Sequence, residues 1–155
     1  MSMKPVVFTV PGNPQGKGRP RVGKVGNHAR MFTPAKTVAY EGLVAIAAQQ
    51  AMAGRDLMTG PVLVELRIVV SVPQSWSKKR KALALAGQLF PTTKPDKDNV
   101  IKAIYDGING IVWKDDVQAV DGFQTKRYGE VPGVTVRVVP LIDADTENYS
   151  AEGAA

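Results

Sequence analysis

The sequence predicts a single α+β domain, in which helices pack on a small mixed or antiparallel sheet in the order β-α-β-α-α-β-β. Two observations favour this class: alternating apolar residues mark strands, and apolar stripes with a spacing of three to four residues mark helices between them. A third is size, because 155 residues with 44% hydrophobic and 22% charged residues suffice for one packed core. The same composition excludes a largely disordered chain.

The first half of the chain contains two predicted strands and one predicted helix. Residues 6–10 form a short apolar run closed by Pro-Gly, which predicts a strand. Residues 11–32 are rich in glycine and proline and are expected to form a long basic loop. A helix should then begin with Thr33 as its N-cap and Pro34 at its first position. Residues 62–72 alternate between apolar and mixed side chains, as a strand with one buried face does.

The second half predicts two helices followed by a hairpin. Residues 75–86 favour a short basic helix, which we expect Trp76 to anchor in the core, although that ring could instead stack on a base. Residues 94–99 predict a turn that leads into a second helix with a stripe of isoleucines. Residues 117–128 and 134–141 predict the two strands of a β-hairpin.

Charge is distributed unevenly along the chain. Twenty Lys and Arg against fourteen Asp and Glu give a net charge of +6, and residues 1–40 contain seven basic residues and no acidic one. We expect one domain over residues 1–141 and a disordered acidic tail over 142–155. The basic surplus predicts a polyanionic partner. The expected phosphate-contacting cations are Lys17, Arg19, Arg21, Lys24, Arg30, Lys36, Lys78, Lys79, Arg80 and Lys81.

Several kinds of site are excluded by residue type. The absence of cysteine rules out disulfides and thiolate metal sites, and a single histidine argues against zinc. Residues 12–18 look like a phosphate loop, but Gly18 stands where Ser or Thr should be, so no nucleotide cofactor is expected. No apolar stretch reaches the roughly 18 residues of a membrane span, and we expect a cytoplasmic protein without a secretion signal.

Carboxylates gather in two motifs of the second half. Asp96 and Asp98 lie two residues apart before a helix, a spacing that predicts parallel side chains, and Lys102 follows one turn later. Asp115 and Asp116 precede the next strand, which could fold Asp116 back onto the first pair. Clustered carboxylates repel one another unless a cation binds, and oxygen ligands select Mg²⁺ or Mn²⁺. Lys102 could then stabilise charge on a phosphate.

Ordinary structural roles explain the same residues equally well. Asp98 could be a helix N-cap, which stabilises a helix by about 1 kcal/mol. Asp98 and Lys102 could form a surface ion pair contributing about 0.3–0.5 kcal/mol. Asp115 and Asp116 could be a solvated turn.

The motifs, taken in order, resemble those of the RusA family of Holliday-junction resolvases. The resemblance covers about residues 6–139 and rests on two separated blocks that match in sequence order. These blocks are KPDKDNVIKAIYDGING and VWKDDVQAV, and they are accompanied by PGNPQGKGRPR, TPAKTVAYE and VPQSWSKKRK.

The resemblance implies a homodimeric, Mg²⁺-dependent endodeoxyribonuclease of bacterial or phage origin. It would cut two strands of like polarity at a four-way DNA junction during recombination and repair, with Mn²⁺ as a substitute metal. The implied metal ligands are Asp96, Asp98 and Asp116, with Lys102 as a catalytic residue and Asp115 in support. Two alternatives remain open: a nuclease acting on other branched DNA such as flaps, and a non-catalytic protein that binds branched DNA.

Overall fold

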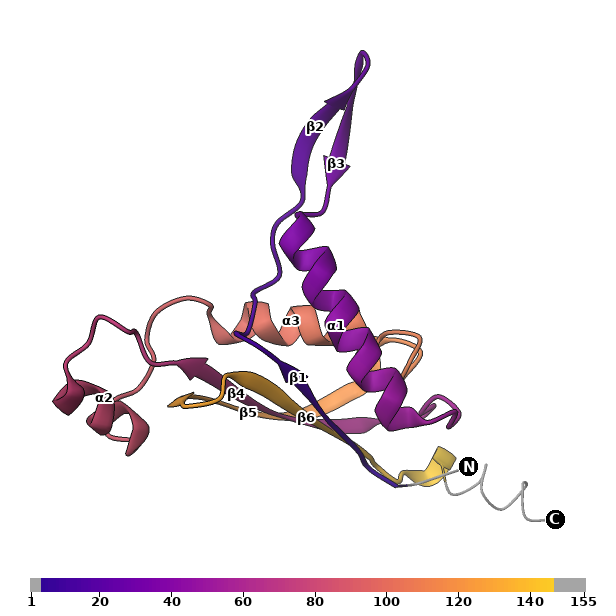
Figure 1. Ribbon diagram of the computed structural model, residues 1–155. Helices are drawn as coiled ribbons and strands as arrows, with labels where there is room; N and C mark the ends of the chain where they lie inside the picture. Colours follow the sequence, from indigo (N-terminus) through magenta and orange to yellow (C-terminus); the bar gives the residue numbers. More distant parts are fainter. Residues whose placement is uncertain (1–3, 147–155) are drawn as a thin grey trace.

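The computed structural model describes residues 4–146 and confirms the α+β class (Figure 1). A four-stranded mixed sheet has the order β1-β6-β4-β5, with β4 parallel to β5 and antiparallel to β6. Helices α1 (Ala35–Met52) and α3 (Lys97–Ile108) cover one face of this sheet. The strands are β1 (Val6–Pro11), β4 (Val62–Ser71), β5 (Ala119–Gly129) and β6 (Gly133–Pro140).

The core lies between the sheet and the two helices. Because side chains alternate along a strand, every second residue of β4 from Val62 to Ile68 is buried on the helical face. From α3 the core receives Ile104 and Ile108, the centre of the predicted isoleucine stripe, and Trp113 follows them. This packing holds α3 firmly against the sheet and leaves the opposite side of the helix available for a site.

The second face of the sheet is uncovered in the described part of the chain. Val7 is 54% exposed and Phe123 is 66% exposed on the outer strands. Between them lies an ion pair, with a guanidinium nitrogen of Arg137 3.1 Å from a carboxylate oxygen of Glu65. The face therefore combines apolar side chains with both signs of charge.

Helices α1 and α3 approach each other closely at Gly107. A Cβ atom built at this position would lie 2.7 Å from Cγ1 of Val44. We expect Gly107→Ala to lower the free energy of unfolding by about 1–3 kcal/mol, because the extra methyl group overpacks the contact. Urea denaturation measures this change.

Gly42→Ala is the matched control, since a Cβ there meets nothing within 4 Å and Ala favours a helix. Equal stabilities of the two variants would contradict a tight crossing.

The prediction that residues 11–32 form one long loop is wrong. Strands β2 (Arg21–Val25) and β3 (His28–Phe32) form an antiparallel hairpin, which projects from the amino end of α1 (Figure 1). Gly26 has a φ of 63°, as the first position of a two-residue hairpin turn requires. The glycine and proline content predicted a loop, whereas the Gly-Asn pair between two short alternating segments signals the hairpin.

The hairpin predicted for the last two strands is also wrong. β5 and β6 lie on opposite sides of β4, so residues 130–132 carry the chain across the end of that strand. The short Pro-Gly turn looks like a hairpin connection in the sequence. However, β4 is a long apolar strand, and a central position lets it pair on both edges and bury its apolar face. Tertiary pairing thus overrides the local turn signal.

Helix boundaries differ slightly from the predictions. Pro34, rather than Thr33, occupies the N-cap of α1, and no side chain caps this helix. Helix α2 (Lys78–Leu85) begins at Ser77, whose hydroxyl accepts a hydrogen bond from the backbone N–H of Arg80. The prediction that Trp76 anchors α2 in the core is wrong, because its half-buried ring lies outside the core cluster. The ring instead packs edge-to-face on Tyr128 of β5, with centroids 5.3 Å apart, and the Arg80 guanidinium lies 4.2 Å from its centroid.

The carboxyl-terminal segment is described only as far as residue 146. Residues 144–146 adopt a helical turn, and the carboxylate of Asp143 accepts hydrogen bonds from the backbone and hydroxyl of Thr146. The rest of the tail predicted to be disordered lies outside the described residues. Across residues 4–146, none of the helices has the length and apolar character needed to cross a bilayer.

Candidate active site on helix α3

The two aspartates of the first motif lie at the start of α3. Asp96 is the N-cap, and its carboxylate accepts a 2.7 Å hydrogen bond from the side-chain amide of Asn99. Asp98 lies inside the first helical turn and is exposed. The capping role considered for Asp98 is therefore wrong. The expected extended approach through both aspartates is also wrong, because only Asp96 is extended and Asp98 already belongs to the helix, where successive residues rotate by about 100°.

One face of α3 presents a line of charged side chains. Asp98, Lys102 and Asp106 follow at intervals of four residues, which places them one above another on the helix surface. The ammonium nitrogen of Lys102 lies 3.9 Å from a carboxylate oxygen of Asp106 and its side chain is 60% exposed. Lys102 is thus held loosely and faces solvent, where a phosphate could reach it.

Asp116 joins this face from the segment that follows the helix. It begins a short 3₁₀ turn, η1 (Asp116–Gln118), so β5 starts at Ala119, two residues later than predicted. Burial, together with the carboxylates of Asp115 and Asp106, raises the pKa of Asp116, whereas the Lys102 ammonium lowers it. Burial and the charge of Asp116 raise the pKa of Tyr105. These electrostatic neighbours locate Asp116 beside the middle of α3.

Gln118 holds the turn in place, a role that the sequence predictions missed. Its side-chain oxygen accepts hydrogen bonds from the backbone N–H groups of Lys114 and Asp115, at 2.9 and 3.1 Å. Its amide nitrogen donates to the backbone oxygens of Met58 and Gly60, at 2.7 and 3.0 Å. The only sequence signal is the Asp-Asp-x-Gln spacing, which completes a capping box with Asp115.

Asp115 itself has a structural task. Its carboxylate accepts a hydrogen bond from the backbone of Gln118, and this reciprocal pair closes the 3₁₀ turn. The carboxylate is therefore engaged in shaping the loop that presents Asp116.

The carboxylates do not form a ready-made metal site. Among residues 4–146, no three acidic or histidine side chains converge closely enough to hold an ion. Asp98 precedes Lys102 on α3, Asp116 neighbours Lys102 from the following turn, and Asp96 lies at the helix start. The donor chemistry nevertheless fits Mg²⁺, because all three are carboxylates. The raised pKa of Asp116 also reflects negative charge that a cation would neutralise.

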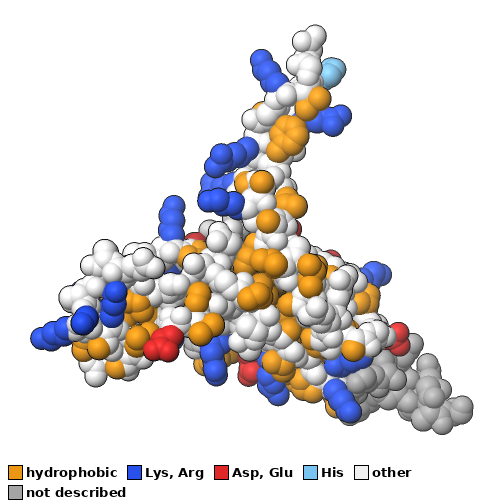
Figure 2. Space-filling model, in the orientation of Figure 1, with side chains coloured by type: hydrophobic (Ala, Val, Ile, Leu, Met, Phe, Trp, Pro, Cys, Tyr) orange, Lys and Arg blue, Asp and Glu red, His pale blue; other side chains and the backbone are white. Residues whose placement is uncertain are grey.

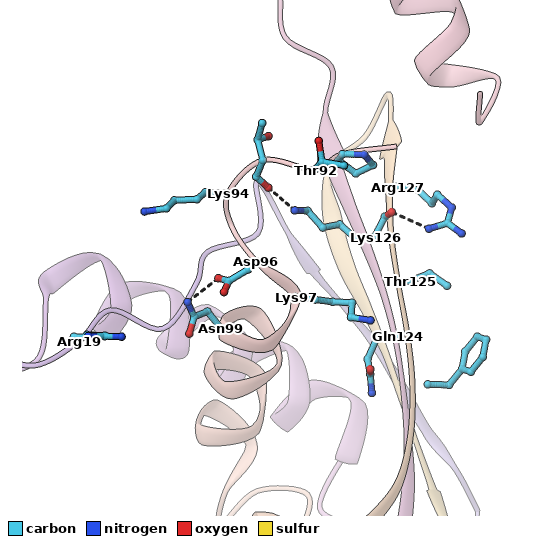
Figure 3. Close-up of a pocket in the computed structure, with 13 residues that line it drawn as sticks. Arg19, Thr92, Lys94, Asp96, Lys97, Asn99, Gln124, Thr125, Lys126 and Arg127 are labelled. Atoms are coloured by element: carbon cyan, nitrogen blue, oxygen red, sulfur yellow. Dashed lines mark hydrogen bonds between the residues drawn. The ribbon is translucent and has the colours of Figure 1, made fainter. Parts of the chain in front are cut away.

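A basic cleft of about 950 Å³ opens beside Asp96 (Figure 3). Strand β5 forms one side and the segment leading into α3 forms another, and among the described residues Asp96 is the one acidic side chain in the lining. The cationic side chains of the cleft are Arg19, Lys94, Lys97, Lys126 and Arg127. Such a surplus of positive charge suits a phosphate backbone.

Four of these five cations were absent from the sequence predictions. Lys94 and Lys97 lie on the approach to α3, whereas Lys126 and Arg127 come from β5. Tertiary folding brings the two segments together: the Lys126 ammonium donates a hydrogen bond to the backbone oxygen of Thr93. No contiguous basic motif marks these residues in the sequence.

The predicted phosphate-contacting cations lie at several separate places on the molecule. The prediction that Lys17 contacts phosphate is corrected by the structure, because its ammonium forms ion pairs within the protein. Its partners are the carboxylates of Glu41 and of Asp106, the latter at 3.0 Å. Arg19 lines the cleft, and Lys36 is exposed at the start of α1. Figure 2 shows Lys and Arg side chains along the projecting hairpin and on the outlying α2 region. The exposed cations there are Arg21, Lys24, Arg30, Lys78, Lys79 and Arg80, and Lys81 is half-buried.

Comparisons with known proteins match almost the whole folded region. The family model described as Endodeoxyribonuclease RusA matches residues 11–139. A protein of Bacillus subtilis (strain 168), named uncharacterized protein YqaN, is 39% identical over 135 residues. That alignment covers 86% of this chain and 94% of the relative. The family match includes the hairpin, α3, the Asp115–Asp116 turn and the basic cleft.

Proposed function

The chain belongs to the RusA family of endodeoxyribonucleases, and from this premise we propose that it resolves four-way DNA junctions by paired, symmetric nicks in the presence of Mg²⁺. The observation that carries the proposal is the charged face of α3. There Asp98 and Lys102 share a helix surface, Asp116 adjoins it, and a cleft with five cations opens at its amino end. Recombination and repair are the processes that such an activity serves.

The proposed division of labour follows from the positions of these side chains. Asp96, Asp98 and Asp116 would hold the cation, with Mn²⁺ as a substitute, and Asp115 supports Asp116 through the turn. A divalent cation, when bound, activates water and stabilises charge on a phosphodiester. Lys102, which is exposed and only loosely paired with Asp106, would place its ammonium against a phosphate oxygen and stabilise the charge that develops there. The cleft cations hold the flanking backbone without reading its sequence.

Cleavage of labelled DNA tests the proposal directly. A mobile four-way junction, a flap and a plain duplex are each incubated with purified protein in Mg²⁺, Mn²⁺ and EDTA. Paired nicks at symmetric positions, confined to the junction and abolished by EDTA, are expected. Faster cutting of the flap would establish the alternative nuclease. Tight junction binding without any metal-dependent nick would establish a non-catalytic binding protein and overturn the proposal.

The basic cleft should account for part of the affinity for DNA. We expect Lys126→Gln with Arg127→Gln to weaken junction binding and to reduce the slope of log affinity against log salt by about two, since each phosphate contact contributes about one. The measurement is a salt titration by fluorescence anisotropy without divalent metal. The exchanged pair Lys126→Arg with Arg127→Lys keeps both charges and should keep the slope. An unchanged slope in the glutamine variant would exclude the cleft from the binding surface.

We further propose that two copies form a two-fold dimer through the uncovered sheet face. A junction has approximate two-fold symmetry, and paired nicks require two active sites. A self-complementary interface needs apolar area and both charge signs on one patch, which Val7, Phe123, Glu65 and Arg137 supply. Packing there leaves the α3 face of each copy open.

Light scattering checks the assembly. The expected molar mass is twice the 16.6 kDa of one chain. Val7→Glu should shift the mass to that of one chain, because a carboxylate would be buried in the interface. Val38→Glu, at an exposed position of α1, should leave the dimer intact. A monomeric parent protein, or a dimeric Val7→Glu variant, would contradict this interface.

A further inference from the structure

We propose that the β2–β3 hairpin inserts an apolar face at the branch point of the DNA junction and contacts the nucleobases there. The inference rests on the proposed function and adds a second contact site to it. Val22 is 70% exposed and Met31 is 64% exposed, although both are large apolar residues. They lie on a two-stranded ribbon that projects away from the sheet and from both covering helices (Figure 1).

The hairpin has two chemically different faces. Paired residues of an antiparallel ribbon share a face, and alternate pairs face opposite ways. One face carries Val22 opposite Met31, followed by Lys24 opposite Ala29. The other carries Arg21 opposite Phe32, Gly23 opposite Arg30 and Val25 opposite His28. The first face is mainly apolar, and the second carries most of the cations.

Phe32 helps to keep this ribbon in shape. A Cβ atom at Gly23 would lie 2.7 Å from the Phe32 ring, so the ring lies directly over the glycine backbone. Phe32 thereby packs within the cationic face, between the two strands. Within residues 4–146, Val22 and Met31 on the other face have no comparable cover and remain available to a partner.

Charge favours DNA over a second copy of the chain as the partner of this hairpin. Residues 4–40 contain no Asp or Glu, and the hairpin carries the cations Arg21, Lys24 and Arg30 in addition to its apolar side chains. Figure 2 shows these two kinds of side chain interleaved along the projection. Two such hairpins would repel one another, whereas a phosphate backbone would neutralise them. Apolar side chains wedge between bases most easily where stacking is already interrupted, as at a branch point.

The root of the hairpin is fixed to the proposed active site. The backbone N–H of Lys17 donates to the backbone oxygen of Asn99, at 2.9 Å, and that of Gly18 donates to the Thr37 hydroxyl, also at 2.9 Å. The Lys17 ammonium is paired with Asp106 on the charged face of α3. A hairpin held in this way keeps a constant offset between the bases it contacts and the phosphate near Asp98.

A junction that carries 2-aminopurine at the branch point tests whether the apolar face of the hairpin inserts between the bases there, which we call the wedge. Fluorescence of this base rises when it unstacks, and binding is measured in EDTA so that cleavage does not intervene. The parent protein should raise the signal at the branch point and leave a probe inside an arm unchanged. Val22→Ser with Met31→Ser should lose the rise and reduce the preference for junction over duplex about tenfold, with duplex affinity unchanged. Met31→Ser alone should give a smaller loss in the same direction.

Two matched variants separate base contact from charge and from surface polarity. Val131→Ser changes a valine that is 82% exposed in the loop between β5 and β6, and it should behave as the parent protein. Arg21→Gln with Arg30→Gln should weaken junction and duplex binding together. Circular dichroism should show native folding throughout, because the hairpin lies outside the core.

The outcomes distinguish this inference from the proposed function. A fluorescence rise that persists in the Val22→Ser, Met31→Ser variant, with an unchanged junction preference, overturns the wedge alone. A parent protein that neither prefers the junction nor perturbs its centre overturns the wedge and the junction specificity together. Equal loss of duplex and junction binding in the serine variant would make the hairpin a general DNA contact and would also overturn the wedge.

Discussion

Replacing Asp98 with Asn is expected to slow junction nicking by about a thousandfold or more while junction binding is retained. The substitution keeps the size of the side chain and removes its charge. Asp98 is exposed on the face that it shares with Lys102, so its carboxylate is available to a cation or a water molecule rather than to the fold. Removing a negative charge from the surface that would face the DNA phosphates should leave the affinity for DNA unchanged or slightly higher.

Single-turnover nicking of a prebound junction, started with Mg²⁺, measures the rate, and anisotropy in EDTA measures the affinity. Stability should fall by less than about 1 kcal/mol, the size of a favourable interaction between a carboxylate and a helix start. Asp121→Asn is the matched control, since Asp121 is an exposed carboxylate on β5. If the Asp98→Asn variant nicks the junction at the parent rate, Asp98 has no role in the cleavage reaction. Loss of binding in a folded variant would assign it to DNA contact instead.

The sequence predicts the parts of the fold that depend on local periodicity. The alternating pattern of β4 and the isoleucine stripe of α3 each describe one element and its buried face, and both are confirmed. Strand pairing is different, because it depends on which edges meet after collapse. The three-residue link between β5 and β6 favours a hairpin locally, yet β4 pairs with both strands and separates them. Partner choice is a property of the whole sheet.

The candidate site divides in the same way. The spacing of Asp98, Lys102 and Asp106 follows the helix period, so the sequence alone predicts that they share a face. Asp96 falls on the helix boundary, where a shift of one or two residues turns the side chain elsewhere. The cations of the cleft come from separate segments that become neighbours only when β5 lies beside the approach to α3. Internal ion pairs, such as those of Lys17, likewise appear only in three dimensions.

Gln118 shows how one polar side chain can position a carboxylate that it does not touch. Its amide links the Lys114–Asp115 backbone to the backbone of the segment at Met58 and Gly60. Gln118→Leu keeps a similar volume but leaves two N–H groups and two carbonyl oxygens without this partner. We expect the free energy of unfolding to fall by about 3 kcal/mol, since unsatisfied polar groups in a partly buried site are costly.

The same substitution should reduce nicking by loosening the turn that presents Asp116. At a temperature where the variant remains folded, we expect the Mg²⁺ concentration for half-maximal nicking to rise about tenfold, equivalent to about 1.4 kcal/mol of lost cation affinity. Gln50→Leu, on the exposed surface of α1, should change neither stability nor the Mg²⁺ requirement. A stability loss without any change in Mg²⁺ dependence would make Gln118 a purely structural residue. A higher Mg²⁺ requirement, with junction affinity in EDTA unchanged, would show that Gln118 acts on the reaction by holding Asp116 in position.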